Sequence, residues 1–214
     1  MNMQPAVNAL KDIGLHLARL QQQVRPWDRE DKSEVEQEAD SLAHKFLTER
    51  LTSHFPGLPV ISEEDREHTT DRPKDYFLID PIDGTASWSG GFEGYVCQLA
   101  RIKDSEVVFG AIYAPAKKMT WTATRGQGAF LNGQPLALPE AAMSQTPVVV
   151  DNFPTPRGIA AELRSLFGTF EYVESGSIGL KAALVATGKA DLFIKDVVVR
   201  DWDVAPALAL MQEV

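Results

Sequence analysis

Apolar residues recur at helical spacing through the first part of the chain. Between Pro5 and Gln23 they fall three or four positions apart, which predicts an amphipathic helix. A charged stretch, Arg25 to Glu38, follows, and a second helical pattern runs from Val35 to Leu47. Phe55-Pro56-Gly57 ends this pattern, because proline and glycine interrupt helices. The chain therefore begins with two predicted helices.

Short apolar runs of strand length replace the helical pattern in the middle of the chain. They are separated by turn residues, and the last of them alternates apolar and polar positions before a glycine-rich turn, as strands do. The predicted strands are Pro59–Ile61, Tyr76–Ile79, Gly94–Ile102, Val107–Ala114 and Lys118–Thr124. We interpret this portion as an antiparallel sheet covered by the two helices.

A loop-rich stretch, Pro135 to Pro147, marks a predicted boundary between two halves, residues 1–140 and 141–214. Beyond it strands and helices alternate, which predicts a second α/β layer system. The predicted strands are Val148–Val150, Phe170–Val173 and Ala190–Ile194, and the predicted helices are Arg157–Phe167, Ile178–Thr187 and Val204–Glu213. The predicted class is α/β (α+β): a layered α-β-α-β-α sandwich with an antiparallel first sheet and a mixed second sheet.

Charge and composition narrow the function classes. The 214 residues include 30 acidic and 21 basic side chains, a net charge of −9, which argues against a nucleic acid polymer as partner. No stretch approaches the roughly 20 apolar residues of a membrane span. The single cysteine, Cys97, excludes an internal disulfide and a cysteine-based zinc cluster. We therefore expect a cytoplasmic protein.

Three acidic clusters stand where predicted strands end or predicted helices begin, the positions at which α/β folds bind ligands. They are Ile61–Glu64, Leu78–Thr85 and Asp201–Pro206. Each alone has an ordinary explanation as a turn, a solvated pair or a helix cap. Together they indicate an all-oxygen site, which suits Mg²⁺, Mn²⁺ or Ca²⁺ rather than zinc.

The second cluster is the most informative. Asp80 ends an apolar strand, and Asp83 follows three residues later, so that both carboxylates can address the same cations. The Ile82 carbonyl between them is a further oxygen ligand. Gly84 permits a close approach of the backbone, and Thr85 can begin a helix whose free N–H groups would hold a phosphate.

This cluster resembles the signature of the inositol monophosphatase superfamily: an acidic residue, Pro, a hydrophobic residue, Asp, Gly and Thr. The superfamily consists of Mg²⁺-dependent, lithium-sensitive phosphatases and includes bisphosphate nucleotidase-like members. Four further segments resemble motifs of that family in the same order: Ile61–Glu64, Arg125–Gly133, Gly176–Asp191 and Trp202–Ala207. The resemblance covers nearly the whole chain.

The resemblance implies a set of metal ligands. Glu63, Asp80 and the Ile82 carbonyl would bind a first metal, and Asp80, Asp83 and Asp203 a second, with Glu63 also contacting a third, weaker one. Two or three Mg²⁺ ions are implied, with Mn²⁺ as a possible substitute and Ca²⁺ or Li⁺ as inhibitors.

Catalytic roles are implied for Asp40, Thr85, Glu63 and Asp83. Asp40 matches the aspartate that accepts a hydrogen bond from the motif threonine, here Thr85, so that the pair orients and helps to deprotonate the attacking water. The residues before Asp40 depart from the family pattern, and a solvated helix residue is the alternative interpretation. Removal of Asp83 is expected to abolish turnover without unfolding the chain.

Substrate-binding roles are implied for Gly84, Thr85, Ser177, Lys181 and Asp203. Ser177 and Lys181 resemble the nucleotidase branch of the family. Basic Lys195 and Arg200 would meet a second phosphate, whereas Asp196 would bind hydroxyl groups.

We hypothesise a Mg²⁺-dependent phosphomonoesterase acting on a small phosphorylated metabolite by metal-activated water attack. The substrate is 3′-phosphoadenosine 5′-phosphate or an inositol or sugar phosphate, with a slight preference for the nucleotide. Two alternatives stay open: a catalytically silent, metal-binding regulatory member of the same fold, and a fructose-1,6-bisphosphatase-type sugar phosphatase. A homodimer is expected.

The last feature is the end of the chain. Family members continue beyond the Trp-Asp helix, whereas this chain ends at Val214 within it. Either the last elements are absent from this sequence or the protein is naturally short. We favour the first, because a bare apolar sheet edge promotes association.

Overall fold

The first half of the chain builds a seven-stranded sheet with two long helices on one face. A computed structural model describes residues 1–69, 71–137, 146–195 and 198–214, apart from the side chains of Arg164 and Phe167. The helices are α1 (Gln4–Val24) and α2 (Ser33–His54), joined through a short 3₁₀ turn, η1 (Pro26–Asp28). The strands are β1 (Val60–Ser62), β2 (Asp75–Asp83), β3 (Val96–Lys103), β4 (Glu106–Ala114), β5 (Met119–Thr124), β6 (Gly128–Leu131) and β7 (Gln134–Pro135).

Strand order in this sheet follows chain order from β1 to β7. Neighbours are antiparallel except at one edge, where β1 runs parallel to β2. The register between β2 and β3 shifts between Asp80 and Asp83, which marks a bulge. Bulges bend a strand and redirect its side chains, so this one turns the end of β2 out of the regular sheet.

Both faces of the sheet are buried, and alternate residues of β2 contact different layers. Phe77 and Ile79 pack with the apolar faces of α1 and α2, whereas Tyr76 and Leu78 pack with the start of α6 (Asp201–Glu213). Apolar residues on the same face of β3, β4 and β5 pack against α6 and α5 (Ile178–Ala186). The site described below therefore begins on a strand buried between two cores.

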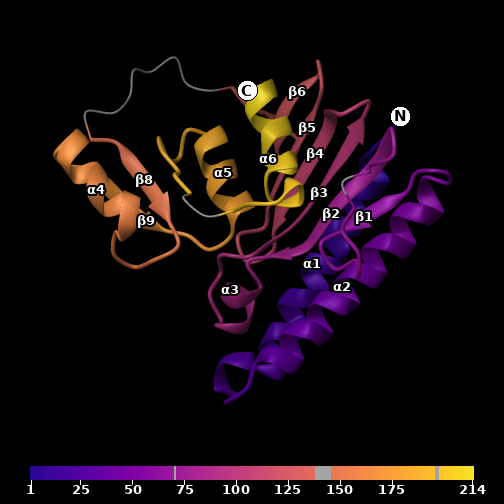
Figure 1. The fold of residues 1–214 in the computed structure, drawn as a ribbon, viewed down its shortest axis with the longest axis horizontal. Coiled ribbons are helices and arrows are strands. Elements are labelled where there is room, and N and C mark those ends of the chain that lie inside the picture. The colour runs from indigo at the N-terminus through magenta and orange to yellow at the C-terminus, as the bar shows by residue number, and fades with distance from the viewer. Residues whose placement is uncertain (70, 138–145, 196–197) are drawn as a thin grey trace.

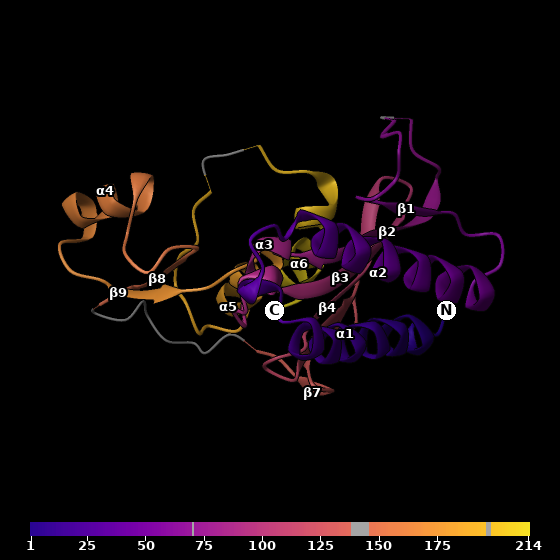
Figure 2. The same ribbon diagram turned by 90° about the horizontal axis from the view of Figure 1, so that it is seen from below.

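The second half adds the remaining layers; its predicted boundary, between residues 140 and 141, lies outside the described residues. Strands β8 (Val148–Asp151) and β9 (Glu171–Glu174) form a small parallel sheet beyond α5, and α4 (Gly158–Phe167) lies outside them. Figure 1 shows helices, sheet, helices, sheet and helix in succession, and Figure 2 shows α4, β8 and β9 at the end of the molecule farthest from α1 and α2. The layered α/β class predicted from the sequence is confirmed. The first sheet, predicted to be antiparallel, contains one parallel pair, β1–β2, and the described strands of the second sheet, predicted to be mixed, are parallel.

Two predicted elements differ from the structure. The strand expected at Ala190–Ile194 is wrong: only Leu192 pairs, in a single bridge to Val149. The Ala190 N–H instead donates to the Leu184 carbonyl at the end of α5, which removes it from any strand ladder. The last helix begins at Asp201 instead of Val204.

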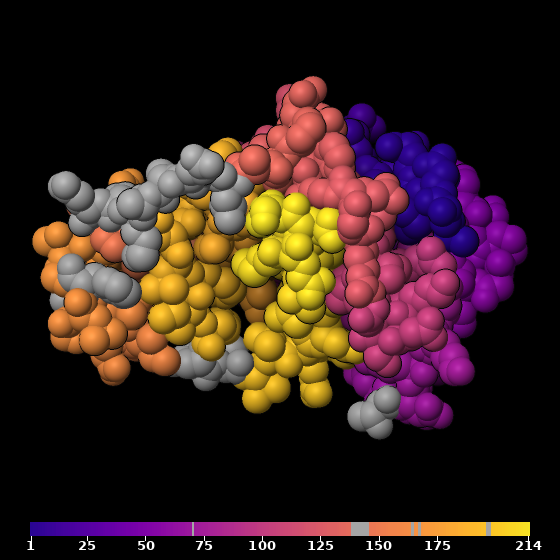
Figure 3. Space-filling model, turned by 90° about the horizontal axis from the view of Figure 1, so that it is seen from above, coloured from indigo at the N-terminus to yellow at the C-terminus, as the bar shows by residue number. Residues whose placement is uncertain are grey.

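Helix α6 packs on the first sheet beside α5. It covers one face of that sheet and presents Val204, Leu208 and Met211 to the outside, each about two-fifths exposed. Figure 3 shows this helix in yellow, at the surface between the first sheet and the second half. None of the helices in the described ranges is long and apolar enough to cross a membrane.

Candidate active site

The end of β2 places two acidic side chains inside the molecule. Asp80 is 1% exposed and Asp83 is 7% exposed. Asp80 stands opposite Gln98 in the register with β3, and the bulge then brings Asp83 opposite Val96. Two carboxylates three positions apart in the sequence therefore lie together below the surface.

Asp80 has one engaged oxygen and one free oxygen. Its Oδ2 accepts a hydrogen bond from Gln98 Nε2 at 3.1 Å, whereas its buried Oδ1 meets no hydrogen-bond donor among the described residues. Burial raises the pKa of Asp80 well above its usual value, and the charges of Asp83 and Glu63 raise it further. A buried carboxylate oxygen without a partner is costly, and a bound cation would remove that cost.

Asp83 connects β2 to the start of α5. Its Oδ1 accepts from the Ile178 N–H at 3.2 Å, and its Oδ2 accepts from the Gly179 N–H at 2.6 Å. Burial raises the pKa of Asp83 to about 7, although these two N–H groups act in the opposite direction. The residue predicted only as a ligand and catalyst thus also holds a helix in place.

Glu63 and Asp203 complete the acidic group. Burial is the main cause that raises the pKa of Glu63, and the charge of Asp203 contributes, while the neighbouring Asp80, which can share a proton with Glu63, opposes the shift. Asp203 Oδ2 accepts from the Arg200 N–H at 2.6 Å and so caps α6. Electrostatic coupling links Asp80 to Glu63 and Asp83, and Asp203 to Glu63 and Asp83. The four predicted acidic ligands therefore face a common region.

The four carboxylates do not form a closed metal cage as placed. Within the described part of the chain, no three acidic, histidine or cysteine side chains are spaced to hold an ion together. Asp83 and Asp203 instead accept hydrogen bonds from backbone N–H groups at the starts of α5 and α6, so the accepting oxygens are directed at the backbone and not at a shared ion position. The donor set of carboxylates, together with the unpaired Asp80 oxygen, nevertheless fits a hard cation such as Mg²⁺.

Thr85 and Asp40 meet as the sequence predicted. Thr85 Oγ1 lies 3.4 Å from Asp40 Oδ1 and 3.0 Å from the Ile82 carbonyl, and its single proton can serve either acceptor. The Ile82 carbonyl, expected as a metal ligand, therefore already has a polar neighbour. Burial raises the pKa of Asp40 to about 7, and Glu64 and Glu63 reinforce this.

Gly84 precedes Thr85 in the left-handed region, with φ of +92°. A Cβ atom there would lie 3.1 Å from Cβ of Ser177, so glycine permits the first turn of α5 to approach. Helix α3 (Thr85–Ser89) begins at this point.

Two anchors hold α3 against the N-terminal helices. The Trp88 indole Nε1–H donates to the Leu17 carbonyl at 3.1 Å, and Gln21 Nε2 donates to the Trp88 carbonyl at 2.7 Å. Ser89 also bonds to the Glu36 side chain. The phosphate-binding turn predicted at Gly84 is thereby attached to both long helices.

Ser177 and Lys181 are already engaged with their own chain. Ser177 is buried, and its Oγ accepts from the Leu180 N–H at 3.1 Å as the cap of α5. Lys181 is fully buried: its Nζ donates to the Gly176 carbonyl at 2.6 Å, bonds to Asn152, and lies 4.9 Å from the centre of the Phe193 ring. Burial lowers the pKa of Lys181 to about 8. As placed, neither side chain is open to a ligand.

The loop expected to meet a second phosphate is only partly described. Lys195 is half-buried, and its positive charge helps burial to lower the pKa of Lys181. Arg200 is exposed. Asp196, expected to bind hydroxyl groups, lies outside the described residues.

Gln98 is the site residue that the sequence reasoning missed. It lies within the run Tyr95–Ala100, which reads as an apolar strand. Its signal was present, because a lone amide in a buried strand must find hydrogen-bond partners. Here its partners are the two carboxylates of β2 and the Trp202 carbonyl.

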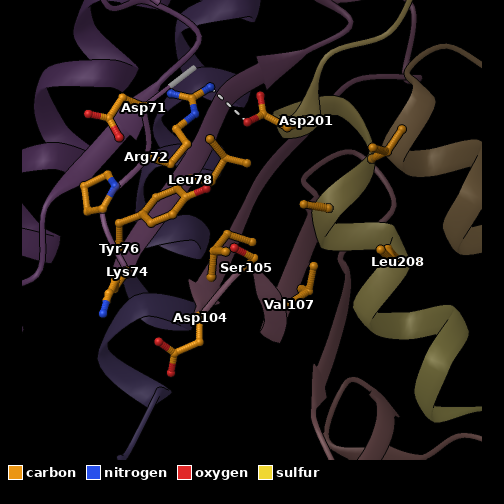
Figure 4. Close-up of a pocket in the computed structure, with 14 residues that line it drawn as sticks. Asp71, Arg72, Lys74, Tyr76, Leu78, Asp104, Ser105, Val107, Asp201 and Leu208 are labelled. Carbon is orange, nitrogen blue, oxygen red and sulfur yellow. Dashed lines mark hydrogen bonds and ion pairs between the residues drawn. The ribbon is translucent and has the colours of Figure 1, made fainter. Parts of the chain in front are cut away.

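A separate cavity of about 750 Å³ lies along the first turns of α6 (Figure 4). It is bounded by the Arg72–Asp201 ion pair, with 2.9 Å between Nη2 and Oδ2, and by Tyr76, Leu78 and Leu208. Its lining includes none of the predicted ligand or substrate residues. The acidic group and this cavity are different places in the molecule.

Known proteins match this chain over nearly its whole length. Residues 3–214 match the model of the inositol monophosphatase family. A 3′(2′),5′-bisphosphate nucleotidase CysQ of Aggregatibacter actinomycetemcomitans is 33% identical over 224 residues, covering 99% of this chain and 81% of the relative. A fructose-1,6-bisphosphatase/inositol-1-monophosphatase of Thermotoga maritima is 28% identical, covering 97% of this chain and 80% of the relative.

A solved structure agrees with this on the fold. Inositol monophosphatase-II from Staphylococcus aureus MSSA476 superposes with a TM-score of 0.81 at 21% identity, covering 99% of this chain and 82% of that one. At 21% identity, this similarity establishes the fold of the chain and not its function.

Proposed function

The chain belongs to the inositol monophosphatase family and is a phosphatase, and we propose that it removes one phosphate from a small bisphosphorylated metabolite, with a 3′(2′),5′-bisphosphate nucleotide as preferred substrate. One observation carries the proposal. Glu63, the pair Asp80 and Asp83, and Asp203 come from three separate parts of the chain and face a common region, in which the pair is buried and Asp80 keeps one oxygen unpaired. Anionic groups are brought together below a surface when a cation offsets their repulsion.

The proposed cofactor is Mg²⁺, held by Glu63, Asp80 and Asp83, with Asp203 and the Ile82 carbonyl as further ligands. When bound, it would supply Lewis acidity that offsets charge on the phosphoryl oxygens. The ligands that now bond to the backbone would have to turn towards it. Mn²⁺ would substitute for Mg²⁺, and Li⁺ and Ca²⁺ would inhibit.

The chain's own groups would bind the phosphate and handle the proton. Backbone N–H groups of Gly84 and Thr85 would hold phosphate oxygens at the start of α3. Thr85 Oγ1, 3.4 Å from Asp40 Oδ1, would accept a proton from the attacking water while its own proton passes to Asp40. A carboxyl whose pKa is about 7 can take up a proton near neutral pH.

The choice of a bisphosphorylated substrate rests on two observations. The relative that is 33% identical is named as a 3′(2′),5′-bisphosphate nucleotidase. The second half also contributes basic Lys195, which is half-buried and lies near Lys181. A basic side chain in this part of the second half would bind a second phosphate.

A panel of phosphate esters tests the proposal. The purified chain is incubated with 3′-phosphoadenosine 5′-phosphate, inositol 1-phosphate and fructose 1,6-bisphosphate, and released phosphate is measured with Mg²⁺, Mn²⁺, EDTA or added Li⁺. We expect fastest release from the nucleotide with Mg²⁺, and loss of release with EDTA or Li⁺. Release that is unaffected by EDTA would contradict the metal assignment, and faster release from inositol 1-phosphate would contradict the substrate assignment.

A sugar bisphosphatase is the second candidate. A relative that is 28% identical is named as a fructose-1,6-bisphosphatase/inositol-1-monophosphatase. Preferential release from fructose 1,6-bisphosphate in the same panel would establish this alternative.

The bonds of Asp83 and Asp203 to backbone N–H groups favour a further alternative, a metal-binding member without turnover. That protein would melt at a higher temperature with Mg²⁺ and release phosphate from none of the three esters. Turnover of any ester excludes it.

We also propose that the chain acts as a cytoplasmic homodimer. The exposed Val204, Leu208 and Met211 of α6 support self-association, and the single cysteine, which is buried, suits a reducing compartment. Sedimentation velocity and cell fractionation test the two statements, and a monomer at micromolar concentration would contradict the first.

A further inference from the structure

We propose that Gln98 is a positioning residue, whose amide clamps the two carboxylates of β2 to the first turn of α6. The inference rests on the proposed function, because the groups it concerns are the proposed metal ligands. Gln98 lies on β3 opposite Asp80 and is fully buried. A polar side chain in that setting is retained for its partners.

One nitrogen atom of Gln98 faces three acceptors. Nε2 lies 3.1 Å from Asp80 Oδ2, 3.2 Å from Asp83 Oδ2 and 3.3 Å from the Trp202 carbonyl. Both carboxylates and the carbonyl only accept, so the amide must present its NH₂ group to them and not its oxygen. Its two hydrogens are therefore shared among three buried oxygens.

The other end of the amide is confined by α5. A Cβ atom on Gly179 would lie 2.2 Å from Gln98 Oε1 and 3.1 Å from Asp83 Oδ2. The same glycine donates its N–H to Asp83. The first turn of α5 thus packs on the amide so closely that a side chain at position 179 would displace it.

The Gln98 amide therefore joins three elements. It contacts β2 through Asp80 and Asp83, α5 through Gly179, and α6 through the carbonyl of the residue before Asp203. Two of these elements belong to the second half of the chain. Ligands that come from separate elements keep one geometry only if such a group connects them.

The clamp also explains which Asp80 oxygen is available. Because Gln98 occupies Oδ2, the unpaired Oδ1 is left for a cation. Without the amide donor, Asp80 and Asp83 would repel each other with no hydrogen bond between them to offset it. The carbonyl of Trp202 would also lose a donor, which frees the turn that carries Asp203.

The test compares Gln98→Met, which keeps the length of the side chain and removes the amide, with Leu99→Val. Leu99 is the next residue of β3, equally buried, and it faces α1 and α2 instead of the carboxylates. Both variants disturb the same strand, and only the first touches the proposed clamp. Two quantities are measured on the full chain: Mg²⁺ affinity by calorimetry, and hydrogen exchange of the peptide spanning residues 200–206 without metal.

For Gln98→Met we expect Mg²⁺ affinity to fall about 10-fold or more, the usual effect of losing an outer-shell partner. Exchange in residues 200–206 should be faster in the metal-free protein. Leu99→Val should match the wild type in both quantities. Equal affinity and equal exchange in Gln98→Met and Leu99→Val would overturn the proposal.

Gln98→Asn covers the case in which the methionine variant does not fold. It keeps the amide but shortens the reach by one methylene, so it should show the same two changes to a smaller extent; wild-type values would again overturn the proposal. Failure of the proposed function is separable, because absence of phosphate release by the wild type leaves the metal-free exchange comparison to decide the role of Gln98.

Discussion

The two walls of the candidate site are built in different ways. The first wall is the end of β2 with α3, held between two cores and anchored by Trp88 and Gln21 to α1. The second wall comes from α5, α6 and a two-stranded sheet whose outer strand, β9, is largely exposed. The first wall is therefore the better supported of the two.

The side chains on the two walls differ accordingly. On the first wall Asp80 keeps an unpaired oxygen, and Thr85 is directed at Asp40. On the second wall Ser177 and Asp203 cap their own helices, and Lys181 bonds to Gly176 and Asn152. From this difference we expect the first wall to supply the chemistry, whereas the second wall would have to break its own bonds before Ser177 or Lys181 could contact a substrate.

Substitution of Asp83 should have the largest effect, because this residue joins the two walls. In Asp83→Asn the amide oxygen can still accept from one of the two α5 N–H groups and the residue itself carries no charge, so we expect turnover to fall more than about 100-fold while the fold is kept. In Asp83→Ala both N–H groups lose their acceptor, and unfolding free energy should also fall by about 2 to 3 kcal/mol. Phosphate release and denaturant unfolding separate the two roles; near-normal turnover of Asp83→Asn would disprove the assignment.

The pH dependence of stability tests whether the buried charge of Asp83 destabilises the metal-free protein. The pKa of Asp83 is raised from 3.8 to about 7, so the folded protein binds that proton more tightly than the unfolded chain does. Stability contributed by this proton is present below the unfolded pKa and is lost as pH rises through about 7. Metal-free protein should therefore lose about 2 to 3 kcal/mol between about pH 5 and about pH 8.

Mg²⁺ should restore much of that loss at the higher pH, because the cation favours the charged carboxylates. Thermal melting at both pH values, with and without Mg²⁺, measures the effect. The control is Asp83→Asn, in which the fall should be smaller. A metal-free protein with a higher melting temperature at about pH 8 than at about pH 5 would contradict the claim that ionised Asp83 destabilises the fold.

Selectivity between bisphosphorylated and monophosphorylated substrates tests the role proposed for Lys195 on the second wall. Removal of the Lys195 charge in Lys195→Ala should raise KM for a bisphosphorylated nucleotide about 5-fold and leave KM for a monophosphate unchanged, as expected for a partly exposed ion pair worth about 1 kcal/mol. Lys189→Ala removes the same charge from an exposed position at the end of α5 and serves as the control. Equal effects of the two variants on KM would contradict the proposed contact of Lys195 with a second phosphate.

The smallest effect is expected at the other end of β2. There Asp75 accepts two hydrogen bonds from Arg101, at 2.9 and 2.7 Å, which hold the pKa of that carboxyl below its usual value. The pair is partly exposed, so Asp75→Asn should cost about 1 kcal/mol or less and leave phosphate release unchanged. Denaturant unfolding and the release assay check this; a large loss of activity would show that the whole strand, and not its acidic end, controls catalysis.

Much of the fold follows from local pattern. The spacing of apolar residues predicted α1 and α2, and the alternation in Lys118–Thr124 predicted β5, because these patterns reflect which faces become buried. The strand at Ala190–Ile194 was wrong because its apolar residues satisfy strand propensity, while the Ala190 N–H bonds to the end of α5. Pattern does not reveal that competition.

Much of the site also follows from the sequence, namely which residues are acidic and which motif they occupy. The pairing of Thr85 with Asp40 was predicted from the resemblance, and the structure brings the two together. The sequence did not indicate that Asp83 caps α5, nor that Gln98 faces both β2 carboxylates, because each relation joins residues distant along the chain.

The sequence by itself determined most of the helices and strands, the family motifs and the chemical type of the ligands, because burial periodicity and motif order are local properties of the chain. Only the tertiary structure decided which oxygen atoms are left free. Buried donors and acceptors usually find partners, and whether α5, α6 or β3 supplies one depends on how those elements pack. Asp80 Oδ1 is unpaired for that reason, whereas both oxygens of Asp83 are engaged.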